Sequence, residues 1–163
     1  MNGVIVGEPM IIEIYMVRKE FGIMMTINEF IRKYRVVEKK DFNGTKFSSL
    51  YENGIWVSVM NPYVICNDDF EFSCQASSTH YSEPRDLADE YTQVEIGFPS
   101  LNDRIIEKYR EDYGWEEDCG LTNPVYPYVP VEVVDELIEF HCGISEKGVL
   151  ERIKELKRKR KVA

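Results

Sequence analysis

Residues 70–76, Phe-Glu-Phe-Ser-Cys-Gln-Ala, alternate strictly between apolar and polar side chains. Successive side chains of a β-strand point to opposite faces, so this period of two places the four apolar residues against a core and the other three in water. Residues 93–98 repeat the pattern, with Val94, Ile96 and Phe98 as the apolar set. Both segments therefore predict half-buried strands of an antiparallel sheet.

Turn signals earlier in the chain indicate hairpins. Asn43-Gly44 and Asn53-Gly54 are each flanked by strand-forming residues. Asn-Gly suits the positive φ angles of a tight type I′ turn, which connects antiparallel strands. We therefore expect strands at residues 35–40, 46–51 and 55–60. Another hairpin is expected around Asn67-Asp68-Asp69, with Cys66 opposite Phe70.

Helix signals begin with Thr26-Ile-Asn-Glu29, which forms a capping box. A short helix should follow and bury one face, formed by Ile27, Phe30, Ile31 and Tyr34.

Further helix signals dominate the last third of the chain. Ser100 is a good N-cap for a helix over 100–113, with Leu101 and Ile105 on its inner face. An extended linker over 115–129 then leads to a helix that begins at Pro130 and ends at Gly143. A last helix should start near Ser145 and run into the basic tail.

This order of elements predicts the fold class and the domain organisation. Strands followed by helices favour an α+β fold, with an antiparallel β-sheet over residues 35–98 and C-terminal helices packed on one face. The chain has 163 residues, a usual size for one domain. We place that domain at residues 25–150, followed by a basic C-terminal helical tail at 151–163.

Residues 1–24 are interpreted as a leading strand or as an over-extended start of translation at Met1. In the second case Met24 or Met25 is the natural start, because codons for Lys19-Glu20 can form a ribosome-binding sequence. Glu8 and Glu13 interrupt the apolar start, which argues against a signal peptide. With no apolar run of membrane-spanning length, the expectation is a cytoplasmic protein, inside a host cell, that does not engage membranes.

Charge is distributed unevenly along the chain. The net charge is −9, yet residues 151–163 hold seven Lys or Arg and two Glu. Residues 67–118 hold fifteen Asp or Glu and four Lys or Arg. That middle section should repel nucleic acid and attract a basic protein partner, although acidity also serves solubility alone. The expected binding residues are Asp103, Glu107, Glu111, Asp112, Tyr113, Trp115, Glu116, Glu117 and Asp118.

The geometry of a helix sharpens this expectation. Helical spacing would place Asp103, Glu107 and Glu111 on one stripe, at a cost of a few tenths of a kcal/mol per like-charged pair. The basic tail complements a helix C-terminus, and it could also hold nucleic acid weakly or fold back on the acidic body.

Cofactor and catalytic signals are weak. The four cysteines form no Cys-x-x-Cys pair, so we expect no cofactor, with zinc on Cys119, His141 and Cys142 as the alternative. His141 is in phase with the buried face of its helix and is expected to be a partly buried residue. A Cys–His pair and a Mg²⁺-binding nuclease site near Glu38-Lys39-Lys40 are weaker possibilities. No Gly-rich phosphate loop is present in the sequence.

Two stretches, Tyr91–Arg104 and Tyr126–Leu137, resemble in texture the small accessory proteins of phages and mobile elements of Gram-positive bacteria. That group includes type II anti-CRISPR proteins. The resemblance and the acidity together predict a non-enzymatic inhibitor that occupies a basic, nucleic-acid-binding surface of a host enzyme. The alternatives are an immunity protein that neutralises a toxin and, in another class, a metal-dependent hydrolase or nuclease.

Overall fold

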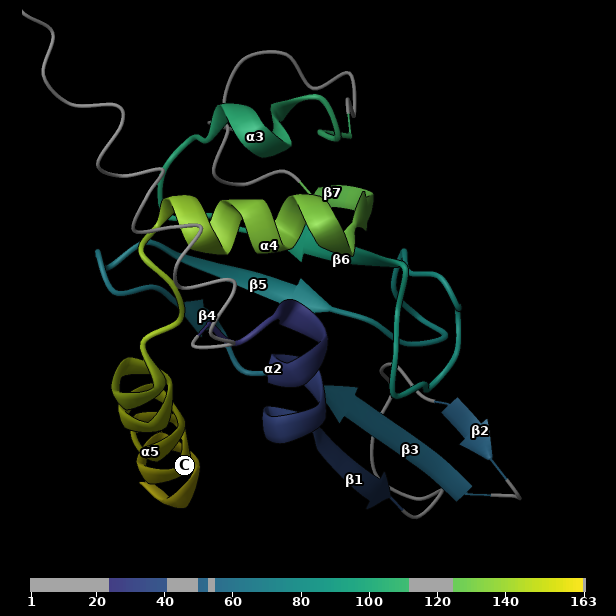
Figure 1. Cartoon of the computed structure of the whole chain (residues 1–163). Coiled ribbons are helices and arrows are strands. Elements are labelled where there is room, and N and C mark those ends of the chain that lie inside the picture. Colours follow the sequence, from purple (N-terminus) through teal and green to yellow (C-terminus); the bar gives the residue numbers. More distant parts are fainter. Residues whose placement is uncertain (1–23, 41–49, 53–54, 112–124, 163) are drawn as a thin grey trace, which may run out of the picture.

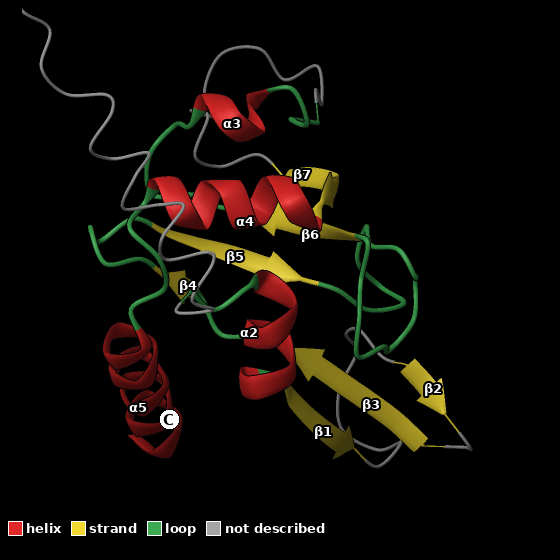
Figure 2. Cartoon of the chain, in the orientation of Figure 1, coloured by secondary structure: helices red, strands yellow, loops and turns green. Residues whose placement is uncertain are grey.

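The computed structural model describes residues 24–40, 50–52, 55–111 and 125–162, and the statements below concern these residues (Figure 1). Figure 2 shows helices and strands mixed along the described chain. The elements in chain order are α2 (Ile27–Tyr34), β1 (Val36–Lys40), β2 (Leu50–Glu52), β3 (Ile55–Met60), β4 (Val64–Ile65), β5 (Glu71–Gln75), β6 (Gln93–Gly97), α3 (Arg104–Glu107), β7 (Val125–Pro130), α4 (Val131–Phe140) and α5 (Glu146–Val162).

The larger sheet has four antiparallel strands in the order β4-β5-β6-β7. Burial alternates along β5 and β6, and Val94 and Ile96 are fully buried. The polar residues between them are only partly buried, so one face of the sheet is covered and the other is half open. The predicted α+β fold with helices on one face of an antiparallel sheet is therefore confirmed. The predicted hairpin before β5 is also correct, because the Cys66 N–H donates to the Phe70 carbonyl at 2.8 Å.

The smaller sheet has three strands in the order β1-β3-β2. The pairs Leu50↔Val57 and Glu52↔Ile55 show that β2 and β3 are antiparallel, as expected for the second hairpin, and the Asn53-Gly54 turn itself lies outside the described residues. The first Asn-Gly predicts that β1 pairs with the strand after it, and this is wrong for the described residues, because β1 pairs with β3 instead. The Asn43-Gly44 turn itself lies outside the described residues.

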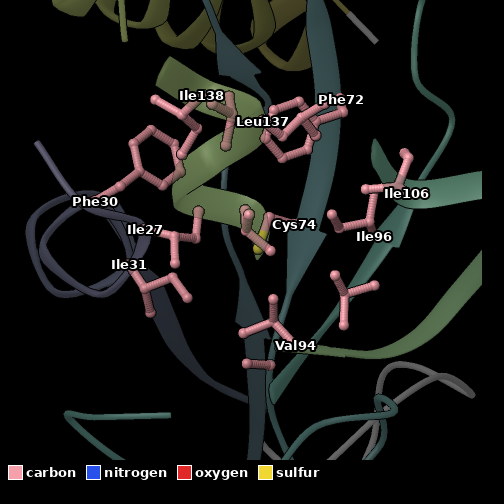
Figure 3. Close-up of a cluster of buried hydrophobic side chains, with 14 of the residues drawn as sticks. Ile27, Phe30, Ile31, Phe72, Cys74, Val94, Ile96, Ile106, Leu137 and Ile138 are labelled. Carbon is pink, nitrogen blue, oxygen red and sulfur yellow. The ribbon is translucent and has the colours of Figure 1, made fainter. Parts of the chain in front are cut away.

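The core lies between the larger sheet and the helices. Figure 3 shows side chains from α2, α4, β5, β6 and α3 converging there. The capping box forms as predicted: the Thr26 N–H donates to Glu29 Oε2 at 2.8 Å, and the Glu29 N–H donates to Thr26 Oγ1 at 3.3 Å. The four apolar residues predicted to face inward from α2 are all buried. Helix α4 buries Val134, Leu137 and Ile138, in agreement with its sequence pattern.

The helix predicted over residues 100–113 is much shorter. Helix α3 spans only Arg104–Glu107, and its N-cap is Asp103 rather than Ser100. Ser100 pairs with β5 instead: its N–H donates to the Glu71 carbonyl at 2.8 Å, and its hydroxyl accepts from the Glu71 N–H at 3.0 Å. The Glu111 N–H donates to the Val125 carbonyl at 3.0 Å. Because Ser100 and Glu111 are both hydrogen-bonded to strands, the segment between them forms a single helical turn.

The predicted linker over 115–129 also needs correction, because its last part is strand β7. Pro124 and Pro127 indicated an extended linker rather than a regular strand, and proline cannot donate to a ladder. At the edge of a sheet that loss is tolerated, and β7 is an edge strand of the four-stranded sheet. Residues 115–124 lie outside the described part of the chain.

Substitution of two phenylalanines, one buried and one exposed, tests the position of the core. Phe72 is fully buried, and Phe140 is 69% exposed. We expect Phe72→Ala to lower the free energy of unfolding by about 3–5 kcal/mol, because it leaves a cavity. The matched control Phe140→Ala should change it by less than about 0.5 kcal/mol. Urea unfolding followed by circular dichroism measures both, and equal losses would contradict this placement of the core.

Candidate functional site

A histidine joins three segments that are far apart in the sequence. His141 is the C-cap of α4. Its Nδ1 lies 2.7 Å from Asp68 Oδ2, just before β5, and its Nε2 lies 3.1 Å from Asp103 Oδ2, at the N-cap of α3. The ring stacks on Phe70 at 3.7 Å between centroids, with 10° between the planes. We call this set of four residues the His141 joint.

The residues of the joint hold one another in place through hydrogen bonds and ring stacking. The His141 ring is 7% exposed, and both of its nitrogens face carboxylates. In the imidazolium form both nitrogens donate to these carboxylates at the same time. The Asp–His–Asp arrangement therefore ties the segment before β5, the N-cap of α3 and the end of α4 to one another.

The contact changes the acidity of Asp68. Burial raises the pKa of its carboxyl, but hydrogen bonds from His141 and from the Phe70 N–H outweigh this effect and hold the pKa below its ordinary value. The ionised form of Asp68 is therefore the form that the fold prefers.

Three non-glycine residues with a positive φ angle lie in or next to the segments that meet at His141. Asp69, Phe98 and Cys142 have φ angles of 69°, 50° and 66°, in the left-handed region that favours glycine. Asp69 and Cys142 directly follow Asp68 and His141, and Phe98 lies two residues before Ser100, which pairs with β5. Strain of this kind persists where the surrounding structure enforces it, and it is often found at functional sites.

Apolar side chains are exposed beside the joint. Phe140 is 69% exposed, and its ring meets the His141 ring edge-on at 5.2 Å. Leu101, two residues before Asp103, is 64% exposed, and Phe98 is 52% exposed. We call Leu101 and Phe140, which flank residues of the joint, the apolar patch. The sequence pattern predicted that Phe98 and Leu101 are buried, and this is wrong: Phe98 leaves the strand at a positive φ, and Leu101 precedes the helix.

The outer face of α4 is acidic. Its ten residues include four acids and no Lys or Arg. Asp135 is used internally, because its Oδ1 accepts the N–H of Ile27 at 2.7 Å at the start of α2. Glu132 and Glu136 are exposed, and Glu139 is partly buried, which raises its pKa. Within the described chain these three glutamates, which we call the α4 acidic face, form no ion pair.

Helical spacing links this face to Phe140. Glu132, Glu136 and Phe140 follow one another at intervals of four, so they are neighbours along one stripe of α4. Figure 1 shows α3 beside α4, and Leu101 lies two residues before Asp103, which contacts His141 at the end of α4.

The acidic stripe predicted at 103, 107 and 111 does not form. Asp103 faces inward, with its side chain 10% exposed, because it caps α3 and contacts His141. Glu107 is exposed, but it lies among Arg104, Lys108 and Arg110, which are exposed as well. Glu111 is partly buried, beyond the end of α3. The other predicted binding residues lie outside the described residues: Asp112, Tyr113, Trp115, Glu116, Glu117 and Asp118.

Two of the three cysteines that the structure describes are buried in surroundings that disfavour the thiolate. Cys66 and Cys74 are fully buried; burial raises the pKa of Cys66 to about 12 and also raises that of Cys74. A high pKa disfavours the thiolate, which is the form that binds metals and attacks substrates. Cys142 is exposed. Of the proposed zinc ligands, Cys119 lies outside the described residues, and His141 is held by its two aspartates.

Ser77 and His80 form another pair that resembles catalytic chemistry. The Ser77 hydroxyl lies 2.7 Å from His80 Nδ1, and burial lowers the pKa of His80. However, Ser77 is 1% exposed, and its oxygen also accepts from the Thr79 N–H at 3.2 Å. The hydroxyl therefore holds a turn of the loop, and a substrate could not reach it without opening that loop.

Two features of the candidate site, the α4 acidic face and the His141 joint, were not predicted from the sequence. The α4 acidic face was visible as three glutamates in a helix without cations, but the more acidic segment after residue 100 drew the prediction. The His141 joint gave no local signal, since its three polar partners lie far apart in the sequence.

Comparison with known proteins does not assign the chain to a family. No protein-family model matches it, and neither the curated proteins nor the solved structures give a significant match. In the part of the chain that the structure describes, no helix combines the length and the apolar character needed to cross a lipid bilayer.

The His141 joint predicts a pH dependence. Because the folded-state pKa of Asp68 is depressed, its contact stabilises the fold above the unfolded pKa of about 3.9 and is lost as pH falls through the folded value. At pH 7 we expect Asp68→Asn to lower the free energy of unfolding by about 1 kcal/mol, a modest value because exposed carboxylates are screened.

Urea unfolding between pH 7 and pH 2 measures this effect. The difference between wild type and Asp68→Asn should shrink as the pH falls. Asp69→Asn is the matched control, since asparagine tolerates a positive φ and Asp69 makes no side-chain contact with His141. A difference that is constant with pH would contradict a role for the ionised Asp68.

Proposed function

We propose that the chain is a non-enzymatic inhibitor of the phage anti-defence type, which binds a basic, nucleic-acid-handling enzyme such as a CRISPR effector. The observation that carries this proposal is the stripe on α4, where glutamates without ion-pair partners run directly into exposed aromatic and aliphatic side chains. The further acidic residues between 112 and 118 are part of the proposed surface on sequence grounds alone.

Some carboxylates form ion pairs within the fold and those of the α4 acidic face do not, and this difference supports a binding role. Several acids of the body serve the fold itself: Glu90 and Asp89 pair with Arg32 and Arg35, Glu146 pairs with Lys33, and Glu71 pairs with Arg152. The α4 acidic face has no such task among the described residues. Like charges at an interval of four, as at Glu132 and Glu136, cost the helix a few tenths of a kcal/mol. Only Glu132, in the first turn, is favoured by the helix dipole.

The apolar patch supplies the binding affinity that charge alone does not provide. Charged rims steer encounter and set specificity, whereas affinity comes from a few buried aromatic or aliphatic anchors. Phe140 and Leu101 are large, exposed and adjacent to the acidic face. The His141 joint holds both in place before a partner arrives, which reduces the ordering cost of binding.

The partner that fits the α4 acidic face is a protein with a basic, nucleic-acid-binding surface. Such a surface presents cations spaced for phosphates, and carboxylates on a rigid helix can pair with them. The partner's own nucleic acid would then compete with the inhibitor for one surface.

Charge reversal tests the acidic face. We expect Glu132→Lys/Glu136→Lys to slow association with a guide-loaded type II CRISPR effector about tenfold at low salt, because favourable steering is lost. The difference should narrow at high salt through screening. The matched control Glu83→Lys/Asp86→Lys changes the charge equally on an exposed loop and should retain the fast rate. Surface plasmon resonance at several salt concentrations gives these rates.

Two outcomes of that experiment contradict the proposal. One is that the wild-type chain does not bind the effector at low salt. The other is that it binds but duplex target DNA does not compete with it. Equal slowing by the two reversals would show that net charge, and not the α4 face, is responsible.

Truncation tests the apolar patch. We expect Leu101→Ala/Phe140→Ala to raise the dissociation rate from the same effector by tenfold or more, since anchors act mainly on dissociation. The association rate and the urea midpoint should stay close to wild type, because both side chains are exposed. Loss of binding with an unchanged dissociation rate would contradict an anchoring role.

A further inference from the structure

Helix α5 is anchored only at its beginning. Val149 is fully buried, and Ile153 packs against the core. Lys33 Nζ lies 2.8 Å from Glu146 Oε2, and Arg152 pairs with Glu71. A Cβ on Gly148 would lie 3.0 Å from Ile65 Cγ2, so glycine permits this close contact with β4.

Beyond these contacts the helix leaves the body. Residues 154–159 are all exposed, and Figure 1 shows the C-terminal end of α5 apart from the other labelled elements. The nine residues from 154 to 162 extend about 13 Å at 1.5 Å per residue. The Debye length at physiological salt is about 8 Å, so the far turns are largely screened from the acidic body.

The projecting part is strongly basic. Residues 154–161 hold six Lys or Arg and one Glu. Lys159 pairs with Glu155 at 2.8 Å. Lys154, Lys157 and Arg158 form no ion pair in the described chain, and their spacing of three and four residues places them on one stripe of the helix.

The helix dipole does not account for this stripe. Its favourable effect on cations is confined to the last turn of a helix, whereas Lys154 lies more than two turns before Val162. Neighbouring cations repel one another and weaken the helix, so the stripe has a cost within the isolated chain.

We propose that α5 is a DNA-binding helix, which holds the phosphate backbone of a B-form duplex through Lys154, Lys157 and Arg158. An α-helix with its side chains is about 10–12 Å wide, which matches the major groove of B-DNA at about 12 Å. Single strands fit less well, because the stripe carries no aromatic side chain on which bases could stack. Binding is independent of base sequence, with dissociation constants on the order of 1–100 µM at physiological salt.

Fluorescence anisotropy with a labelled 20-base-pair duplex and the full chain tests the proposal. The wild-type chain should bind at 50 mM salt, with affinity falling steeply as salt is raised to 200 mM. The variant Lys154→Gln/Lys157→Gln/Arg158→Gln should bind more weakly and reduce the slope of log affinity against log salt by about 2.7, since each phosphate contact contributes about 0.9. All three residues are exposed, so the fold should be retained.

A matched variant removes the same charge elsewhere. Arg104→Gln/Lys108→Gln/Arg110→Gln removes three exposed cations near α3 and should leave the salt slope unchanged. Equal weakening by both variants would overturn the assignment to α5, as would the absence of wild-type binding at 50 mM salt. Binding to vesicles that contain phosphatidylserine, without binding to the duplex, would identify the partner as a lipid surface and overturn the proposal. None of these outcomes depends on binding by the α4 acidic face.

Discussion

The contact between one imidazole and two carboxylates ties together the segment before β5, the N-cap of α3 and the end of α4. Helix α3 is a single turn, far too short to be stable by itself. Its position depends on Asp103, whose carboxylate both caps the helix and contacts His141. His141 is in turn fixed at the end of α4 and stacked on Phe70. Removing the imidazole would release α3, the segment that carries Leu101 and the turn before β5 together.

The same contact explains how strained backbone and exposed apolar residues persist at one place. A non-glycine residue at positive φ costs on the order of 1 kcal/mol, and three such residues lie in the segments that meet at His141. The hydrogen bonds and ring stacking of the joint offset that cost. The result is a rigid display of Leu101 and Phe140 beside the glutamates of α4, which a flexible loop could not maintain.

Local patterns predicted much of the fold, and contacts distant in sequence account for the rest. The capping box at Thr26, the alternation before Ala76 and the apolar phase of α4 are short-range signals, and the structure agrees with each. The length of α3 depends on bonds from Ser100 and Glu111 to strands, which no local pattern shows. Strand β7 was missed because proline is a poor strand former, except at an edge. The α4 acidic face was not predicted, and most of the predicted binding residues, from Asp112 to Asp118, lie outside the described residues.

Among the described residues, unpaired charges of opposite sign lie on two surfaces, the α4 acidic face and the stripe on α5. Pairing inside the body uses the cations of α2 and the first turns of α5. Among the described residues this leaves the α4 glutamates and Lys154, Lys157 and Arg158 of α5 without ion pairs. Opposite charges within one small protein would neutralise each other if they could meet, and the projection of α5 prevents this. If both proposals hold, DNA bound by α5 would bring the α4 face close to any protein that arrives at the same DNA while its nucleic-acid-binding surface is still free. Weak attachment through a tethered site raises the local concentration of the second site, so micromolar DNA binding would be sufficient to strengthen inhibition. The basic helix would then complement the acidic face, although in isolation their charges argue for opposite partners.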